Sequence, residues 1–383
     1  MTTDLLIAQG NELRAQHRPI EALKFYAWAF VNDPESPSAW NNYGNVLREC
    51  GQPARSIPFL EHARILDPTN VTAEFNLGVA YLAVGDYAKG WPLYESRWRY
   101  EHLAGTKPSL GVPEWNGQDL KGKTLLVVGE QGLGDQIQFL RFCGPLQDMG
   151  AKLRIHVTSS IKPLLINTPA TILSVTSDNE EIGEFDYWVS MMSVPRILNI
   201  GVKELQHYLQ YVAVDNNKVA EWANRLGPKN RMRIGIAWSG RKDSWINQHK
   251  SMPVDVMAKF VKNHPEHEWI SLQVDASDED SAIMQAAGVN CYPGTIASFA
   301  DSAALMHHLD LVISVDTAAA HLAGALGRPL WMPLNLYGTC WRWMQNTDSS
   351  PWYTTARLFR QETFGDWQPV IKKIEKYLSW FKI

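Results

Sequence analysis

An acid follows a glycine-rich turn where a predicted strand leads into a helix. The run "GEQGLGDQIQF" covers residues 129–139, comes directly after the apolar run "TLLVV", and carries Asp135 behind three glycines. A carboxylate in the first turn of a helix is stabilised by the helix dipole and caps the helix. A carboxylate in a cleft can also act as a general base that takes a proton from a hydroxyl group. These residues leave both interpretations of Asp135 open.

The order of the glycines argues against a dinucleotide-binding or phosphate loop. It is G-x-x-G-x-G-D rather than G-x-G-x-x-G, and no Lys-Ser or Lys-Thr pair follows. The next predicted strand, "LRIHVTSS", ends in hydroxyl residues and not in the acid that would bind a ribose. What remains is a flexible glycine turn that carries Asp135 to the start of a helix at a cleft.

The run "LVISVDTAAAHLAGALGRPLWM", residues 311–332, predicts an anion site. A strand ends at Val315, Asp316 and Thr317 are helix-start residues, and a helix of very small residues follows. Backbone N–H groups at such a start face the cleft unpaired and suit a phosphate. His321 lies one turn into this helix and either reaches a ligand or packs. The alternative is a well-capped helix without a ligand.

Two further stretches carry ligand-binding chemistry. In "IGIAWSGRKDSWINQHKSMP", residues 234–253, a strand opens into a loop with Arg241, Lys242, His249 and Lys250. Cations on a loop over a cleft suit a diphosphate, although solvated basic loops are common. Trp341 and Arg342 either stack on a base or sugar, or wedge the lobes or the final helix.

The first third of the chain is a repeat that could position a partner. Small residues and prolines recur every 34 residues, namely Gly10, Gly44 and Gly78, Ala29 and Ala63, and Pro34 and Pro68. Glycine and alanine let two helices cross closely, and proline ends the second helix. The pattern resembles three tetratricopeptide repeats, the third atypical at its end. Such arrays bind peptides or partners, or only cap the following domain.

The rest of the chain alternates short β-rich runs with helical stretches. The predicted strands are "TLLVVG", "LRIHV", "TILSV", "FDYWVS", "RIGIAW", "EWISLQV", "NCYPG", "LVISV" and "PLWMP". This alternation predicts two Rossmann-like lobes of parallel sheet with ligands beyond the carboxyl ends of the strands. The expected domains are 1–104 for the three repeats, 105–226 for the N-terminal lobe, and 227–383 for the C-terminal lobe. An amphipathic C-terminal helix closes the last of these.

Four pieces together resemble bacterial tetratricopeptide-repeat proteins with a heptosyltransferase-like domain (glycosyltransferase family 9, GT-B fold). They are "GEQGLGDQIQFLRF", "IGIAWSG", "DTAAAHLAGALGRP" and "WRWMQNTDSSPWYTTARLFRQ". The resemblance implies that Asp135 is the catalytic base, that Lys250 binds donor phosphate, and that the acceptor side is 105–226 and the nucleotide-sugar side 227–383. The sequence departs from the family pattern at two places: Lys250 stands where Arg is usual, and "LNLYGTCWRWM" stands where an Asp-Trp-Arg-Trp form is usual. The resemblance implies donor contacts at Trp238, Ser239, Gly240, Lys250, Asp316, Thr317, Ala318, Ala319 and His321. Gln273 joins Gly132, Gly134, Gln136, Trp341 and Arg342 as possible sugar, base or acceptor contacts.

The function expected is inverting transfer of a sugar from a nucleoside diphosphate sugar to an acceptor hydroxyl on a protein or glycan recruited by the repeats. No cofactor or metal is expected, since "DED" at Asp278–Asp280 reads as a capping box behind Ser277. The alternative is a non-catalytic repeat adaptor with a degenerate GT-B domain. An epimerase of the same fold is disfavoured, because it needs no acceptor module.

Bulk composition limits the partners. The chain has 383 residues, a net charge of −4 and four well-separated cysteines without a CxxC pair. A basic excess that would favour nucleic acid is absent, and no apolar run approaches the length of a membrane span. The N-terminus lacks a signal-peptide pattern, so we expect a cytoplasmic protein, with an oligomer possible.

Overall fold

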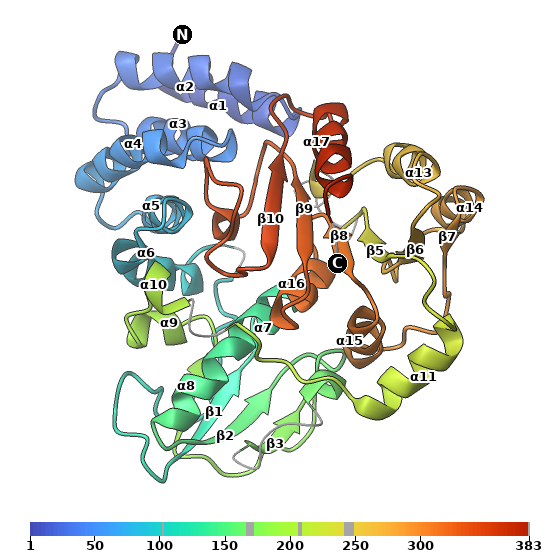
Figure 1. Ribbon diagram of the computed structural model, residues 1–383. Coiled ribbons are helices and arrows are strands. Elements are labelled where there is room, and N and C mark those ends of the chain that lie inside the picture. The colour runs from blue at the N-terminus through green and yellow to red at the C-terminus, as the bar shows by residue number, and fades with distance from the viewer. Residues whose placement is uncertain (102, 166–171, 206–208, 241–248, 382–383) are drawn as a thin grey trace. The chain divides into compact units, whose positions relative to one another are not determined.

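The computed structural model describes the chain except residues 102, 166–171, 206–208, 241–248 and 382–383 (Figure 1). Two compact units are treated separately below. Unit 1 comprises Met1–Ser109 with two later segments, Asn199–Val202 and Leu336–Thr347. Unit 2 comprises Leu110–Leu198, Lys203–Asn335 and Asp348–Ile383.

Unit 1 contains three helical hairpins, which confirms the three predicted repeats. The hairpins are α1 Thr3–Ala15 with α2 Pro19–Asn32, α3 Pro37–Glu49 with α4 Pro53–Leu66, and α5 Val71–Ala83 with α6 Tyr87–Tyr94, followed by the 3₁₀ turn η1 Glu95–Trp98. The repeated glycines lie where the helices of a hairpin meet. A Cβ on Gly10 would lie 2.5 Å from the Tyr26 ring, and one on Gly44 would lie 2.8 Å from Leu60. A side chain at either position would therefore push the paired helices apart.

The two later segments of unit 1 were not predicted to join the repeats. Gly338 donates its N–H to the carbonyl of Glu49 at 2.8 Å, and the Trp91 indole donates to the carbonyl of Ile200 at 3.0 Å. The predicted boundary at residue 104 is close to Ser109, but the repeats also include chain from within both expected lobes.

The first sheet of unit 2 has four parallel strands in the order β3-β2-β1-β4. The strands are β1 Thr124–Val128, β2 Lys152–His156, β3 Ile172–Thr176 and β4 Tyr187–Ser190. The associated helices and turns are α7 Leu133–Phe139, η2 Leu140–Phe142, α8 Cys143–Asp148, η3 Lys162–Leu165, α9 Val194–Ile197 and α10 Val202–Leu205. All four strands were predicted from their short apolar runs.

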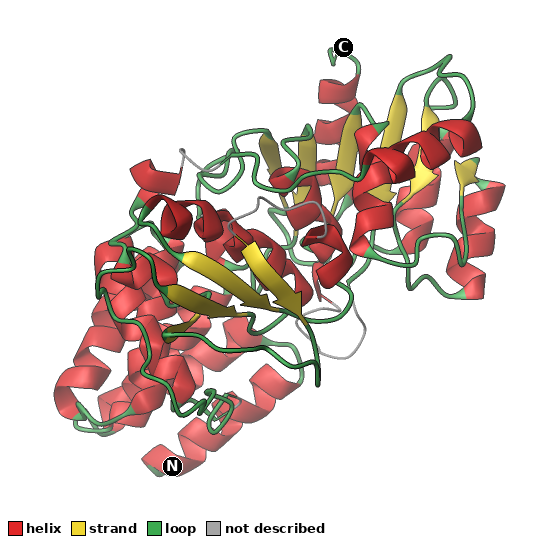
Figure 2. Ribbon diagram, turned by 90° about the horizontal axis from the view of Figure 1, so that it is seen from below, coloured by secondary structure: helices red, strands yellow, loops and turns green. Residues whose placement is uncertain are grey.

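The second sheet has six parallel strands in the order β10-β9-β8-β5-β6-β7, with helices beside the strands (Figure 2). The strands are β5 Arg233–Ala237, β6 Glu268–Ser271, β7 Val289–Asn290, β8 Leu311–Ser314, β9 Leu330–Leu334 and β10 Ala356–Arg360. The helices are α11 Asn216–Leu226, α13 Val254–Lys262, α14 Asp278–Ala286, α15 Phe299–His307, α16 Ala318–Ala325 and α17 Gln368–Leu378, and the turn η4 is Trp341–Trp343. Strand β10 was not predicted, and the run "NCYPG" contributes only its first residue, Asn290, to a strand.

Helices α11 and α17 both pack against elements of the second lobe. The apolar face of α17, with Val370, Ile371 and Ile374, is buried in the core that also holds Ile313 and Trp331, as the amphipathic pattern predicted. Helix α11 packs on α15, where Lys218 Nζ lies 2.6 Å from Asp301. Helix α11 thus contacts a helix of the second lobe, and the expected lobe boundary at 226 stays a prediction.

Among the described residues, none of the helices has both the length and the apolar character needed to cross a bilayer.

Candidate active site

Both sheets reverse their strand order at one point, and the candidate residues lie in the loops there. In the first sheet the reversal lies between β1 and β4, and in the second between β5 and β8. Open parallel sheets bind ligands beyond the carboxyl ends of the strands at such a switch point. The loop after β1 carries Asp135, and the loop after β8 carries Asp316 and Thr317. The topology therefore places each predicted motif where ligands bind.

Asp135 caps α7. Its Oδ2 accepts the backbone N–H of Gly132 at 2.9 Å, three residues before it at the start of the helix. The carboxylate remains partly exposed. The cap interpretation is confirmed by this hydrogen bond, which also fixes the orientation of the carboxylate, while the role of base stays a prediction.

The neighbouring Gln136 joins two loops of the first lobe. Its amide donates to Thr158 Oγ1 at 2.8 Å and accepts the Thr158 N–H at 3.0 Å, and the residue is buried. Its amide thus ties α7 to the loop after β2. One donor and one acceptor position of its amide are used within the lobe, and the expected contact of Gln136 with an acceptor stays a prediction.

The start of α16 offers backbone donors. Thr317 is the N-cap in extended conformation, and its side chain makes no capping hydrogen bond. The Thr317 hydroxyl lies 3.0 Å from the Ser314 hydroxyl instead. The first N–H groups of a helix have no intrahelical acceptor, so those of Ala318 and Ala319, both partly exposed, are available to an anion. We call Thr317, Ala318 and Ala319 the helix cradle.

A lysine, an aspartate and a histidine meet beside the helix cradle. Lys250 Nζ lies 2.9 Å from Asp316 Oδ2, and both side chains are largely buried. His321 Nε2 lies 3.8 Å from Asp316 Oδ1, and its Nδ1 lies 2.9 Å from the Tyr353 hydroxyl. The sequence predicted the first three residues separately, and the structure brings them together. Tyr353 was missed.

The loop after β5 is held by side chains that were expected to bind a ligand. Gln273 accepts the N–H of Ser239 at 3.0 Å and donates to its carbonyl at 2.9 Å. Ser251 accepts the N–H of Gly240 at 3.1 Å. Trp238 is 1% exposed and belongs to the core of the second lobe. Gln273 thus holds the loop after β5 and Trp238 packs in the core, while their predicted ligand contacts stay predictions. Arg241 and Lys242 lie outside the described residues.

The two halves of the site meet at Gly134 and His321. A Cβ built on Gly134 would lie 2.6 Å from His321 Cδ2, closer than real side chains approach. Helix α7 of the first lobe thus packs on α16 of the second through a glycine and an imidazole edge. This contact joins the start of α7, which also bears Asp135, to the helix that carries His321.

Trp341 and Arg342 belong to unit 1. Trp341 is 6% exposed, and its ring is surrounded by those of Tyr87, Trp91 and Tyr94 at centroid distances of 6.4, 5.4 and 6.3 Å. The Arg342 guanidinium lies 4.3 Å from the Trp341 ring centroid. The structure shows these residues packed on the repeats, and their predicted contact with a sugar or base stays a prediction.

Sequence reasoning also missed Glu130, the acid directly after β1. It accepts hydrogen bonds from the Ser190 hydroxyl and, at 3.3 Å, from the Met192 N–H. These contacts join the loops after β1 and β4 at the switch point. The sequence signal for it is an acid that directly follows a predicted strand in "GEQGLGD".

Among the described residues, no three His, Cys, Asp or Glu side chains gather as a metal site, and Ser277 accepts the Asp280 N–H at 3.1 Å as a cap.

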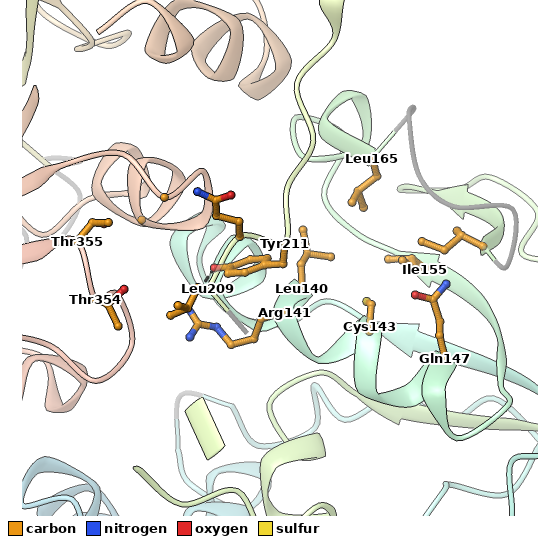
Figure 3. Close-up of a pocket in the computed structure, with 15 residues that line it drawn as sticks. Leu140, Arg141, Cys143, Gln147, Ile155, Leu165, Leu209, Tyr211, Thr354 and Thr355 are labelled. Atoms are coloured by element: carbon orange, nitrogen blue, oxygen red, sulfur yellow. Dashed lines mark hydrogen bonds between the residues drawn. The ribbon is translucent and has the colours of Figure 1, made fainter. Parts of the chain in front are cut away.

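A cavity of about 770 Å³ lies elsewhere in unit 2 (Figure 3). Its lining includes Arg141, Cys143 and Tyr211, and Gly324 near the end of α16. Gly324 is seven residues past Thr317, or roughly 10 Å along a helix. The cavity therefore lies by the opposite end of α16 from the helix cradle, and we do not assign it to the donor.

Comparisons with known proteins agree with this geometry. Residues 282–356 match the model of a family described as glycosyltransferase family 9 (heptosyltransferase), and this stretch includes Asp316, the helix cradle and His321. Protein FlbA of Caulobacter vibrioides is 28% identical over 328 residues, which cover 78% of this chain and 54% of FlbA. The chain thus spans about half the length of this curated relative. These findings support a glycosyltransferase.

Two solved structures resemble the α/β part. A glycosyl transferase family 9 structure from Veillonella parvula is 12% identical with a TM-score of 0.50, and the match covers 68% of this chain and 92% of that one. The ADP-heptose lipopolysaccharide heptosyltransferase II of E. coli is 16% identical with a TM-score of 0.48, covering 67% and 99%. The first match supports the GT-B fold expected from the paired Rossmann-like sheets.

Proposed function

We propose that this chain transfers a sugar, with inversion, from a nucleoside diphosphate sugar to an acceptor hydroxyl. The observation that carries the proposal is the helix cradle with the Lys250–Asp316 pair beside it, on a helix that packs through His321 on the start of α7. The cradle amides and the helix dipole hold the diphosphate, and Lys250 adds a positive charge. Charge on the departing diphosphate grows in the transition state, so donors placed there lower the barrier.

The chemical step is a single displacement. The acceptor hydroxyl gives its proton to the Asp135 carboxylate while its oxygen forms a bond to the anomeric carbon. The bond from that carbon to the diphosphate oxygen breaks, and its electron pair leaves with the nucleoside diphosphate. The Gly132 N–H on Oδ2 keeps the carboxylate in one orientation during this step. The helix cradle and Lys250 hold the leaving group, and the proposal needs no metal.

We further propose that the repeats recruit an acceptor protein through the outer side of α2. Ile20, Trp28 and Val31 are 57, 50 and 71% exposed and share one side of this helix. Exposed apolar patches of this kind mark interaction surfaces. The segment Leu336–Thr347 already lies on the repeats, with Gly338 bonded to Glu49, so that part of their surface is occupied by the chain itself. Replacing Trp28 with Ser should raise KM for a protein acceptor and leave nucleotide binding unchanged.

A donor panel tests the proposal. The purified protein is titrated calorimetrically with uridine, adenosine, guanosine, cytidine and thymidine diphosphates, and the matching sugars are assayed for transfer and hydrolysis. We expect one nucleotide to bind, Lys250→Ala to weaken it about tenfold or more, and the exposed control Lys373→Ala to leave it unchanged.

The aspartate variant separates the cap from the base. An Asn side chain still accepts the Gly132 N–H, so Asp135→Asn should keep the melting temperature while kcat falls about 10²–10⁴-fold. Transfer at the wild-type rate by a folded Asp135→Asn variant would remove Asp135 as the base. No binding of any nucleotide would favour an adaptor instead.

A further inference from the structure

His321 lies where α7 of the first lobe packs on α16 of the second, and the Tyr353 hydroxyl contacts its ring. The Gly134 backbone packs on its ring edge, and Asp316 faces its Nε2. The side chain is 7% exposed, and its Nδ1 lies 2.9 Å from the Tyr353 hydroxyl. A carboxylate opposite Nε2 favours a proton on that nitrogen, so we assign the Tyr353 O–H as the donor to Nδ1.

Tyr353 is fixed by its own surroundings. It is 1% exposed, and a Cβ on Gly324 would lie 2.3 Å from its ring. The ring therefore rests directly on α16, one turn past His321. Its hydroxyl has little room to move away from the imidazole.

Arg141 connects this tyrosine back to α7. It lies in η2, directly after α7, and is 1% exposed. Its guanidinium carbon lies 5.0 Å from the Tyr353 ring centroid, 5.0 Å from that of Trp352 and 4.9 Å from that of Tyr211. Figure 3 shows Arg141 and Tyr211 together at the edge of the cavity.

The hydrogen bonds of Arg141 reach three separate parts of unit 2. Its Nη1 donates to the Trp352 carbonyl at 2.9 Å, Nη2 donates to the Tyr211 hydroxyl at 3.2 Å, and Nε donates to the Gln138 carbonyl at 3.0 Å. A planar guanidinium makes such divergent bonds where an ammonium could not. Arg141 thereby joins the end of α7, the segment after α10 and the chain before β10.

We propose that Arg141 and Tyr353 are positioning residues that hold His321 and α7 in one register across the two lobes. Gly134, His321, Tyr353 and Arg141 form a closed ring of contacts that begins and ends on α7. The ring fixes the distance between Asp135 and the helix cradle before any ligand arrives. This inference rests on the proposed function for its effect on rate, but the contacts themselves are testable without activity.

The test uses Tyr353→Phe, which removes only the hydroxyl. We expect kcat to fall about tenfold, as for a lost hydrogen bond to a positioned group, with calorimetric Kd for the nucleoside diphosphate within about threefold. The matched control is Tyr377→Phe, a partly buried tyrosine of the same lobe, which should change neither. In a His321→Asn background, Tyr353→Phe should have no further effect, because the two act as one unit.

Arg141 is tested by two variants of different severity. Arg141→Lys should lower kcat by a larger factor than it raises Kd for the nucleoside diphosphate. Tyr211→Phe removes one acceptor for the guanidinium, so it should lower kcat by a smaller factor than Arg141→Lys. Rate losses that follow the loss of folded protein, measured by thermal unfolding, would contradict a positioning role.

A readout independent of activity separates this inference from the proposed function. Nitrogen NMR of histidine-labelled protein should show the His321 Nδ1 resonance of an acceptor, shifted in Tyr353→Phe and unchanged in Tyr377→Phe. If the wild type transfers no sugar, the proposed function fails while this shift still decides the inference. An unshifted resonance, or an equal loss of kcat by Tyr353→Phe with and without His321, would overturn it.

Discussion

Gly134→Ala perturbs the contact between the two halves of the site with one methyl group. The new Cβ would lie 2.6 Å from His321 Cδ2, whereas carbon atoms in contact are about 3.5–4.0 Å apart. One helix must therefore move by roughly 1 Å, the difference between these distances. His321 cannot turn aside without breaking its 2.9 Å contact with Tyr353.

Gly134→Ala should lower kcat strongly while it lowers the free energy of unfolding only moderately. Alanine favours a helix over glycine by about 1 kcal/mol, which offsets part of an overpacking cost of about 1–3 kcal/mol. Net destabilisation should be about 2 kcal/mol or less. A misplacement of about 1 Å between reacting groups can lower a rate about 10²-fold. We therefore expect a folded protein whose kcat has dropped by that order.

The assay is steady-state transfer with denaturant unfolding of the same samples. The matched control is Gly144→Ala, also a helical glycine of the first lobe, where a Cβ meets nothing within 4 Å. In a His321→Ala background, Gly134→Ala should cost nothing further, because the ring it meets is gone. An unchanged kcat in the single variant, or an undiminished loss in the double variant, would refute the reasoning.

Three further predictions concern stability and reactivity. Trp341→Ala removes a ring packed against three aromatic residues, so it should destabilise the protein by about 3–5 kcal/mol in urea unfolding, whereas exposed Trp380→Ala should change stability by less than about 0.5 kcal/mol. Burial raises the pKa of Cys143 to about 12, so this thiol should resist a disulfide reagent at pH 8 until the protein unfolds, and fast labelling of Cys143 in native protein would contradict its burial. Burial raises the pKa of Asp301, but hydrogen bonds from Lys218 and Ser298 outweigh this and hold it below its usual value. The stabilisation is thus present above the unfolded-state pKa of about 3.9 and is lost as pH falls through the lower folded value, so Lys218→Met should destabilise the protein at pH 7 and lose that effect at the acid end of a pH series.

Local patterns predicted most of the fold. The 34-residue spacing of Gly10, Gly44 and Gly78 reports helix crossings within a hairpin, and each crossing is made by neighbouring chain. Apolar runs marked eight of the ten described strands, and the predicted run "NCYPG" met β7 only at Asn290. The exception, β10, is a five-residue strand with an arginine at its end, and it pairs with β9 only after a long intervening segment.

The site was predictable where a residue follows its strand directly. Asp135, Asp316 and the helix cradle lie at strand-to-helix turns, so the topology alone carries them to the switch points. Trp238 also follows its strand directly, but its side chain is buried in the core, which local sequence does not reveal. The contacts of Tyr353 with His321 and of Arg141 with the Trp352 carbonyl join residues more than 30 positions apart, which local sequence does not reveal. For Trp341 the sequence left stacking on a ligand and packing open, and its packing on the repeats depends on contacts far apart in the sequence.

The central claim is that the start of α16 binds the diphosphate, and its backbone amides report this directly. Protein labelled with ¹⁵N-alanine is titrated with the nucleoside diphosphate that binds best, and the Ala318 and Ala319 amide signals are followed by NMR. Formation of N–H bonds to phosphate should move both amide protons downfield in wild type, and Lys250→Ala should require a higher ligand concentration for the same shift. Signals of Ala318 and Ala319 that stay in place while the nucleotide saturates the protein would contradict the account.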